Sequence, residues 1–161
     1  MTPRLGLVAL LALAASPALA RDALGVFGDW GAFRDPVPLR CYAIAQSTTQ
    51  RPHDPRGWLA VGSWPRAGQR GVVHAHLSRP AAAGVPASLT IGATRIVLVG
   101  AGSDAWAPDP RGDAAIVAAM RSGAKLYVQA RGADGRRVVD SYPLPGAASA
   151  IDAAAVGCAG R

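Results

Sequence analysis

Two histidines, His74 and His76, are the residues of this sequence best suited to metal chemistry. They stand two positions apart in an alternating segment, so both imidazoles project from one face of an expected strand. His53, in the preceding polar loop, is the candidate for a third ligand. The alternation is also explained by a solvated polar strand face opposite Val73 and Leu77, which is the explanation we favour. A periplasmic metal-binding protein, or a metal-assisted hydrolase using this pair, is the alternative function that stays open.

Other catalytic and cofactor motifs are weak. Residues 100–105 form a G-x-G-x-x-A pattern after an apolar strand, as dinucleotide-binding folds do. Trp106, Pro108 and Pro110 occupy the stretch where the phosphate-binding helix must continue, so we expect a flexible loop and no cofactor. The sequence has no G-x-S-x-G elbow, and all its acidic residues are Asp, mostly at expected turns or helix caps. These features favour a protein that is not an enzyme.

The two cysteines, Cys41 and Cys158, lie near the two ends of the expected mature domain. Two such cysteines in an exported protein usually pair, and the sequence has no C-x-x-C spacing typical of a metal site. In the chain-entropy model, a cross-link that closes so long a loop stabilises the fold by about 4–5 kcal/mol. We therefore predict a disulfide, with two free thiols or one catalytic cysteine as the alternative.

The first 20 residues have the pattern of an export signal. Arg4 supplies the positive charge, residues 5–15 are an uncharged apolar run, and Ala18-Leu19-Ala20 has the small-x-small pattern that signal peptidase requires. The apolar run is shorter than the ~20 residues that span a bilayer, and no later stretch is long and apolar enough. We expect cleavage before Arg21, a periplasmic or secreted protein, and no transmembrane segment in the mature chain.

The charge balance leaves two kinds of partner open, an unknown protein or an anionic component of the cell envelope. Removal of the signal leaves 16 Lys and Arg residues against ten Asp, a net charge near +6. The arginines are scattered, with no run longer than Arg136-Arg137. Such a charge favours loose attraction to anionic lipid or polysaccharide. An exported chain without a basic and aromatic motif is not expected to bind nucleic acid.

Short alternating segments separated by turn residues predict an all-β fold in residues 21–161. Gly92-Ala93 and Asp134-Gly135 are two-residue turn signals, each between alternating apolar runs, and each predicts a β-hairpin. Trp30 and Cys41 fall on the first two expected strands, where Trp30 can fill much of the core. The sequence predicts a single immunoglobulin-like antiparallel β-sandwich domain.

Two short helices are expected within this sandwich. Asp109 and Pro110 form a cap and first-turn pair, and the helix that follows should stop at Gly123. The Ala-rich segment 147–156 predicts a second helix that carries Cys158 toward Cys41.

Four segments carry a resemblance through their order and spacing: Phe27 to Trp30 with Cys41 to Gln46; the hairpin Leu89 to Val99 leading to Trp106; the helix Asp113 to Ser122 with the strand Lys125 to Arg131; and Ser141 to Ala147 followed by Ala150 to Ala153 and Cys158. In these segments the chain resembles the invasion-associated locus B family of exported alphaproteobacterial proteins. The resemblance implies an immunoglobulin-like β-sandwich without known catalytic residues, and it links some members to host-cell entry. The early cysteine that the family usually has is absent here, and so is a second, internal cysteine pair, so neither disulfide pattern nor site residues transfer.

Overall fold

The computed structural model of the protein describes residues 21–49 and 55–159. The expected signal, residues 1–20, and His53 lie outside the described residues, so the predictions made for them stay predictions. Within these two segments no helix is long and apolar enough to cross a membrane.

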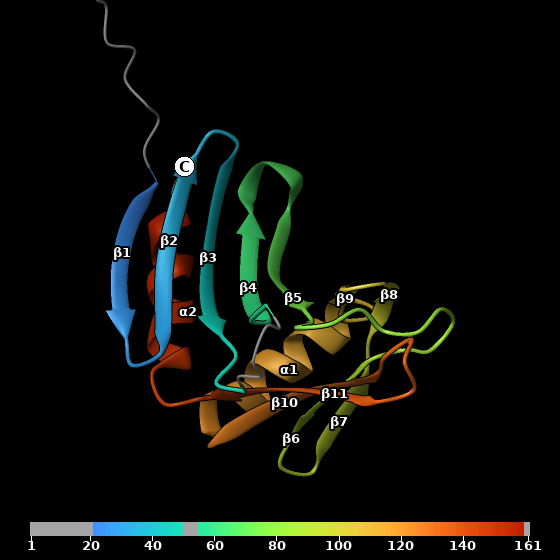
Figure 1. The fold of residues 1–161 in the computed structure, drawn as a ribbon. Helices are drawn as coiled ribbons and strands as arrows, with labels where there is room; N and C mark the ends of the chain where they lie inside the picture. Colours follow the sequence, from blue (N-terminus) through green and yellow to red (C-terminus); the bar gives the residue numbers. More distant parts are fainter. Residues whose placement is uncertain (1–20, 50–54, 160–161) are drawn as a thin grey trace, which may run out of the picture.

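The larger of two sheets has seven antiparallel strands in the order β1-β2-β3-β4-β5-β9-β8 (Figure 1). A 3₁₀ turn, Pro65–Ala67, joins β4 to β5. The strands are β1 (Asp22–Phe27), β2 (Trp30–Pro36), β3 (Leu39–Gln46), β4 (Trp58–Trp64), β5 (Gln69–His76), β8 (Val99–Ala101) and β9 (Asp104–Trp106).

The smaller sheet has four antiparallel strands in the order β11-β10-β6-β7. Two helices, α1 (Pro110–Ser122) and α2 (Ala147–Cys158), complete the fold. The all-β class, with two antiparallel sheets and two short helices, is confirmed. The four strands are β6 (Ser88–Ile91), β7 (Thr94–Val97), β10 (Lys125–Arg131) and β11 (Arg137–Pro143).

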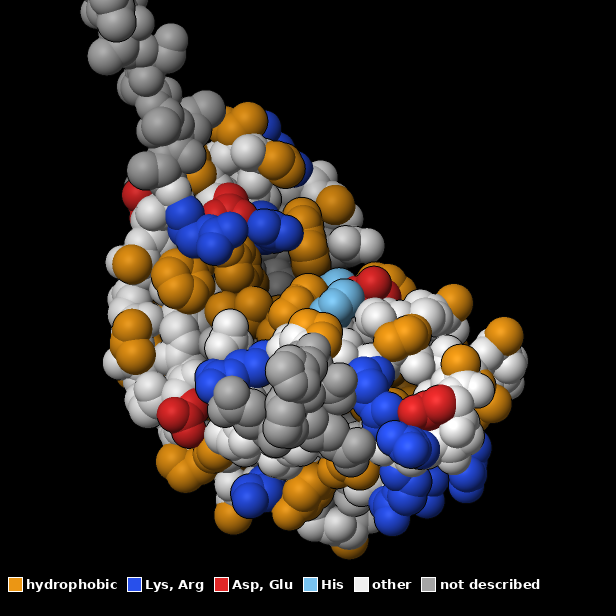
Figure 2. Space-filling view, viewed as in Figure 1, with side chains coloured by type: hydrophobic (Ala, Val, Ile, Leu, Met, Phe, Trp, Pro, Cys, Tyr) orange, Lys and Arg blue, Asp and Glu red, His pale blue; other side chains and the backbone are white. Residues whose placement is uncertain are grey.

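The large sheet has one covered and one open face. Alternation places Leu59 and Val61 of β4, and Val73 and Ala75 of β5, in the core, each at most 4% exposed. Helix α2 lies behind β1 to β3 on this covered side (Figure 1). The other side, which faces the viewer in Figures 1 and 2, carries neither α1 nor α2; we call it the open face.

Helix α1 begins where the sequence predicts. The Asp109 carboxylate accepts a hydrogen bond from the Gly112 N–H at 2.7 Å, and Pro110 follows in the first turn. The helix ends before Gly123, as predicted, but this glycine is extended (φ −76°) and not left-handed. Close packing explains the glycine instead, since a Cβ there would lie 2.5 Å from Cγ2 of Ile91.

Helix α2 packs one face of small side chains on the large sheet. Ala147, Ala150, Ile151, Ala154 and Cys158 are its buried residues, at the spacing of one helix stripe. The short alanine side chains allow the helix to lie close to the strands. At its end, Cys158 forms the predicted disulfide with Cys41 of β3, across a sequence separation of 117.

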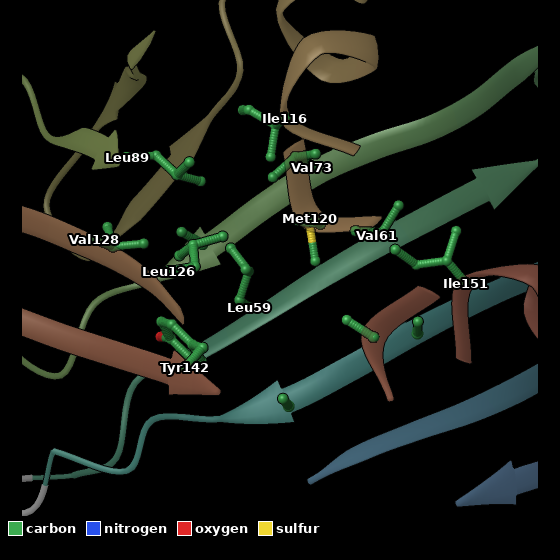
Figure 3. Packing of buried hydrophobic residues seen from close by; sticks show 14 of the residues in the cluster. Leu59, Val61, Val73, Leu89, Ile116, Met120, Leu126, Val128, Tyr142 and Ile151 are labelled. Carbon is green, nitrogen blue, oxygen red and sulfur yellow. The ribbon is translucent and has the colours of Figure 1, made fainter. Parts of the chain in front are cut away.

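The two sheets and both helices share a single hydrophobic core (Figure 3). Leu59 of the large sheet, Leu126 of the small sheet and Ile116 of α1 are each completely buried. Trp30 is also completely buried, as predicted, and its indole N–H donates to the Pro143 carbonyl at 2.8 Å. This hydrogen bond satisfies the polar atom of a buried tryptophan and joins β2 to the end of β11.

The predicted turn at Asp134-Gly135 is wrong in length, although the hairpin exists. Arg131 pairs with Arg137, so the β10–β11 loop has the five residues 132–136. A two-residue turn would have paired Ala133 with Arg136 and shifted the register by one residue. The turn at Gly92-Ala93, in contrast, connects β6 and β7 as predicted.

Two segments form strands where the sequence did not indicate them. The stretch expected to be a flexible loop after Val99 is the β8–β9 hairpin, which turns at Gly102 with a φ of +63°. Strand β1 precedes the strand of Trp30, so Trp30 and Cys41 lie on the second and third strands.

Candidate functional site

The two histidines lie side by side on the open face. Val73, Ala75 and Leu77 of the same segment are buried, and His74 and His76 project to the opposite side, as the alternation predicts. Their side chains are 24% and 35% exposed. Both rings are therefore accessible from solvent.

Asp104 of β9 joins this pair. Its Oδ1 atom lies 2.8 Å from Nε2 of His74 and 2.9 Å from Nδ1 of His76. The pairing of β9 with β5, in which Asp104 is opposite His76, brings the carboxylate there. Partial burial raises the pKa of Asp104, but the hydrogen bonds from His76 and His74 outweigh it and leave the pKa below its usual value.

The histidines pack among tryptophans. His74 stacks on Trp106, with ring centroids 4.4 Å apart, and meets Trp58 edge-on at 4.7 Å. His76 stacks on Trp58 at 5.3 Å. This part of the strand is a cluster of aromatic rings, and not the purely polar face that we favoured from the alternation.

The structure adds Asp104 as a neighbour of the two candidate metal ligands, but the described residues do not form a complete metal site. Asp104 is close enough to both histidines to hydrogen-bond them. Within residues 21–49 and 55–159, however, no group of three or more His, Cys, Asp and Glu side chains is arranged to hold a metal ion. Since His53 lies outside these segments, the metal site stays a hypothesis.

A second aromatic cluster lies on the same open face, beside two arginines. Arg40 lies over the Tyr42 ring at 4.8 Å, and Arg21 lies over Tyr42 at 5.4 Å and over Phe33 at 5.6 Å. Asp35 accepts hydrogen bonds from both guanidinium groups. Burial raises the pKa of Asp35, but these hydrogen bonds outweigh it and lower the pKa overall.

A hollow of about 250 Å³ separates the arginine group from the histidine pair. Figure 2 shows it as a dark recess between the blue and red side chains near the top and the pale blue histidines. Its floor is formed by short residues, Ala60 and Gly62, and its walls by larger ones: Arg21, Arg40, Tyr42, Ile44, Trp58, Trp64, Val72 and His74.

The outer face of the small sheet gathers arginines that are far apart in the sequence. Arg95 of β7, Arg131 of β10 and Arg137 of β11 are exposed and line one shallow hollow of about 210 Å³. Lys125 projects from the same side of β10. We call this surface the basic face; Figure 2 shows Lys and Arg side chains gathered over the β10–β11 hairpin.

The basic face has little compensating negative charge. Asp134 pairs with Arg79 and approaches Arg136 at the hairpin tip. Among the described residues, Arg95, Arg131 and Arg137 form no ion pair with a carboxylate; they contact Ser88, the Gly135 carbonyl and Gln129, respectively. Arg131 and Arg137 stand directly opposite each other in the ladder, an arrangement that costs stability.

Sequence reasoning missed Asp104, the tryptophan packing and the basic face. The alternation of Asp104 and Trp106 around Ala105 was a signal for a strand, but it did not indicate which strand is its neighbour.

No protein-family model, curated protein or solved structure matches this chain.

Proposed function

We propose that this chain is an exported, non-enzymatic binding protein that associates with an anionic component of the cell envelope through the basic face. The observation that carries this proposal is the gathering of Arg95, Arg131 and Arg137 from three strands without a carboxylate partner among the described residues. Each Lys or Arg near an anionic surface contributes about 1 kcal/mol of attraction.

The unfavourable pairing of Arg131 with Arg137 supports this assignment. Like charges directly opposite in an antiparallel pair destabilise the sheet by a few tenths of a kcal/mol up to about 1 kcal/mol. An anion bound between the two guanidinium groups would turn this repulsion into a shared attraction. The basic face is therefore better explained by ligand binding than by stability.

Export is supported by the leader pattern of residues 1–20 and by the disulfide between Cys41 and Cys158, which suits an oxidising compartment. The periplasm, or the medium outside the cell, is the location we propose. A role in contact with host cells follows only from the resemblance to the invasion-associated locus B family.

The non-enzymatic assignment is supported by the surroundings of the histidines. Their hydrogen-bond partner among the described residues is Asp104, and no Ser, Thr or Cys is bonded to either ring there. Both cysteines are joined in the disulfide. An activated nucleophile of the usual kind needs such a contact with its base.

Co-sedimentation with lipid vesicles tests the proposal. The mature protein should bind vesicles that contain phosphatidylglycerol, should not bind vesicles of phosphatidylcholine alone, and should be released at about 1 M salt, where the Debye length is about 3 Å. The triple variant Arg95→Gln, Arg131→Gln, Arg137→Gln should lose this binding.

The matched control is the triple variant Arg66→Gln, Arg70→Gln, Arg111→Gln, which removes the same charge from exposed positions elsewhere. Equal loss of binding in both variants would show that net charge alone is responsible and would contradict a dedicated face. Absence of binding by the unmodified protein to anionic vesicles and to isolated envelopes would contradict the function itself.

A further inference from the structure

The open face of the large sheet carries five aromatic side chains, of which Tyr42 is buried, and they include three of the protein's four tryptophans. Trp58, Trp64 and Phe33 are half-buried, and Trp106 is 38% exposed. Large aromatic residues on one surface are a signature of a binding site when they are contiguous. We define the aromatic face as Phe33, Tyr42, Trp58, Trp64 and Trp106.

Two of these rings lie against glycines of the sheet. A Cβ at Gly62 would lie 3.0 Å from Cη2 and Cζ3 of Trp64, so the six-membered ring of this indole rests on the glycine backbone. Phe33 covers Gly31 in the same way, with Cε2 at 2.6 Å from the position of a Cβ. Arg21 already lies over the Phe33 ring at 5.6 Å, so Trp64 is the ring of this pair that we assign as a platform.

The hollow beside Trp64 can hold a small ring, such as one ligand unit, but it is too small for a cofactor. Its volume of about 250 Å³ is below the range of about 300–1,000 Å³ that is typical of pockets for drug-sized ligands. Ala60 and Gly62 keep its floor low, and Trp58 and Trp64 stand on either side. A ligand unit placed there would lie between two indoles.

Hydrogen-bonding groups at both ends of the hollow are fixed in place. Asp35 orients Arg21 and Arg40, and Asp104 orients His74 and His76. Each histidine uses one ring nitrogen for Asp104, and its second nitrogen has no partner among the described residues. These nitrogens are available to hydroxyl groups, as donors or as acceptors.

The charged side chains of this site already have partners. The guanidinium groups of Arg21 and Arg40 bond Asp35, and Asp104 is bonded to the histidines. Cations that already have carboxylate partners do not suit a phosphate or a strongly acidic ligand. The site suits a neutral ligand that combines flat apolar surfaces with many hydroxyl groups.

We propose that the aromatic face binds a glycan, specifically a chain of β-1,4-linked pyranose sugars. Such sugars are flat, because their substituents are equatorial, and their axial C–H groups form an apolar surface that stacks on an aromatic ring. One sugar lies on Trp64, between this ring and Trp58, and its hydroxyl groups meet the arginine group on one side and His74 on the other.

A protein strand is a poor fit to this surface. Strands β2 to β5 are each paired on both sides, so their backbone groups are not available for strand addition. Aliphatic side chains, the usual contacts of an apolar protein interface, contribute only Ile44 and Val72, beside the short Ala60, to the lining of the hollow. The glycan site is also separate in sequence and charge from the basic face, so either can fail without the other.

Titration of the mature protein with cellohexaose and chitohexaose tests the proposal by calorimetry and by NMR of the indole N–H groups. At least one of the two should bind, with an affinity that about 1 M salt leaves unchanged. The Trp58 and Trp64 signals should shift. The Trp30 signal should not, because this indole is buried and bonded to the Pro143 carbonyl.

Trp64→Ala should weaken binding about tenfold or more, as expected for an aromatic anchor. Ala60→Gln, which fills the floor of the hollow from the open face, should also weaken it and provides a second variant if Trp64→Ala does not fold. Tyr127→Ala is the matched control, because Tyr127 is 37% exposed on the small sheet. It should bind like the unmodified protein.

Failure of both hexasaccharides to bind would overturn the proposal. So would binding that Trp64→Ala and Ala60→Gln leave intact, or binding that the Trp30 signal follows and the Trp64 signal does not. Vesicle binding that survives these two variants would leave the function of the basic face standing.

Discussion

The imidazole of His74 lies almost parallel to the indole of Trp106, with 15° between the ring planes and 4.4 Å between their centroids. Asp104 holds the outer edge of the same imidazole through Nε2. The histidine is thus fixed by a ring contact and a hydrogen bond at once. This arrangement makes the histidine pair part of the aromatic surface, so its chemistry and that of the tryptophans have to be tested together.

Asp104→Asn should destabilise the protein at neutral pH and not in acid. Because the folded-state pKa of Asp104 is lowered, its contribution is present above the unfolded pKa of about 3.9 and is lost as the pH falls through the folded pKa. The carboxylate is 40% exposed, so solvent screening limits the expected loss to about 0.5–1 kcal/mol. Urea unfolding of the variant and of the unmodified protein, at pH 7 and below about pH 3, measures the difference in the free energy of unfolding at each pH.

The exposed Asp29 supplies the control for this experiment, as Asp29→Asn. A difference between Asp104→Asn and the unmodified protein that is the same at both pH values would show that the carboxylate charge is not what matters.

Removal of the disulfide, as Cys41→Ala with Cys158→Ala, should lower the free energy of unfolding by about 4 kcal/mol. The bond joins residues with a sequence separation of 117, and a closed loop of this length restricts the unfolded chain strongly. Denaturant unfolding of the oxidised protein and of the double variant measures the difference. A loss below about 1 kcal/mol would mean that the unfolded state is already restricted by other means.

Arg131→Gln should weaken vesicle binding without weakening the fold. The substitution removes the repulsion between Arg131 and Arg137, so the free energy of unfolding should rise by a few tenths of a kcal/mol. Thermal unfolding and co-sedimentation, performed on the same preparation, test both directions. A variant that is destabilised and binds vesicles as before would assign Arg131 a structural role.

A zinc titration addresses the metal hypothesis for His74, His76 and His53. Because Asp104 Oδ1 already accepts a hydrogen bond from each of the first two rings, and no group among the described residues is arranged to hold a metal, we expect no heat of binding at micromolar protein. Stoichiometric binding that His74→Gln removes would contradict this expectation.

Local patterns of the sequence were sufficient for much of the fold. The alternation in β5 separates Val73 and Ala75 from His74, since side chains of a strand point to opposite faces. The start of α1 could be predicted from Asp109 and Pro110, because an N-cap residue and a first-turn proline each affect only the first turn of the helix. The cysteine pairing could be predicted from the expected oxidising compartment and from the presence of two cysteines, without knowledge of the strands.

The candidate sites depend on contacts between distant segments, and local patterns do not contain these. Asp104 reaches His76 only because β9 returns to the large sheet after the β6–β7 hairpin has joined the small one.

The basic face depends on the β10–β11 register: the two-residue turn expected at Asp134-Gly135 would have placed Arg131 opposite Val138. A shift of one residue moves every side chain to the other face of the strand, and the five-residue loop places the two arginines together.

The intact mass of the protein purified from the envelope of the cells that produce it tests most directly the central claim, that an exported chain is closed by its own disulfide. The mass should correspond to a chain that begins at Arg21, and treatment with an alkylating agent under non-reducing conditions should leave it unchanged. A mass that still includes residues 1–20, with both Cys41 and Cys158 alkylated, would contradict the account.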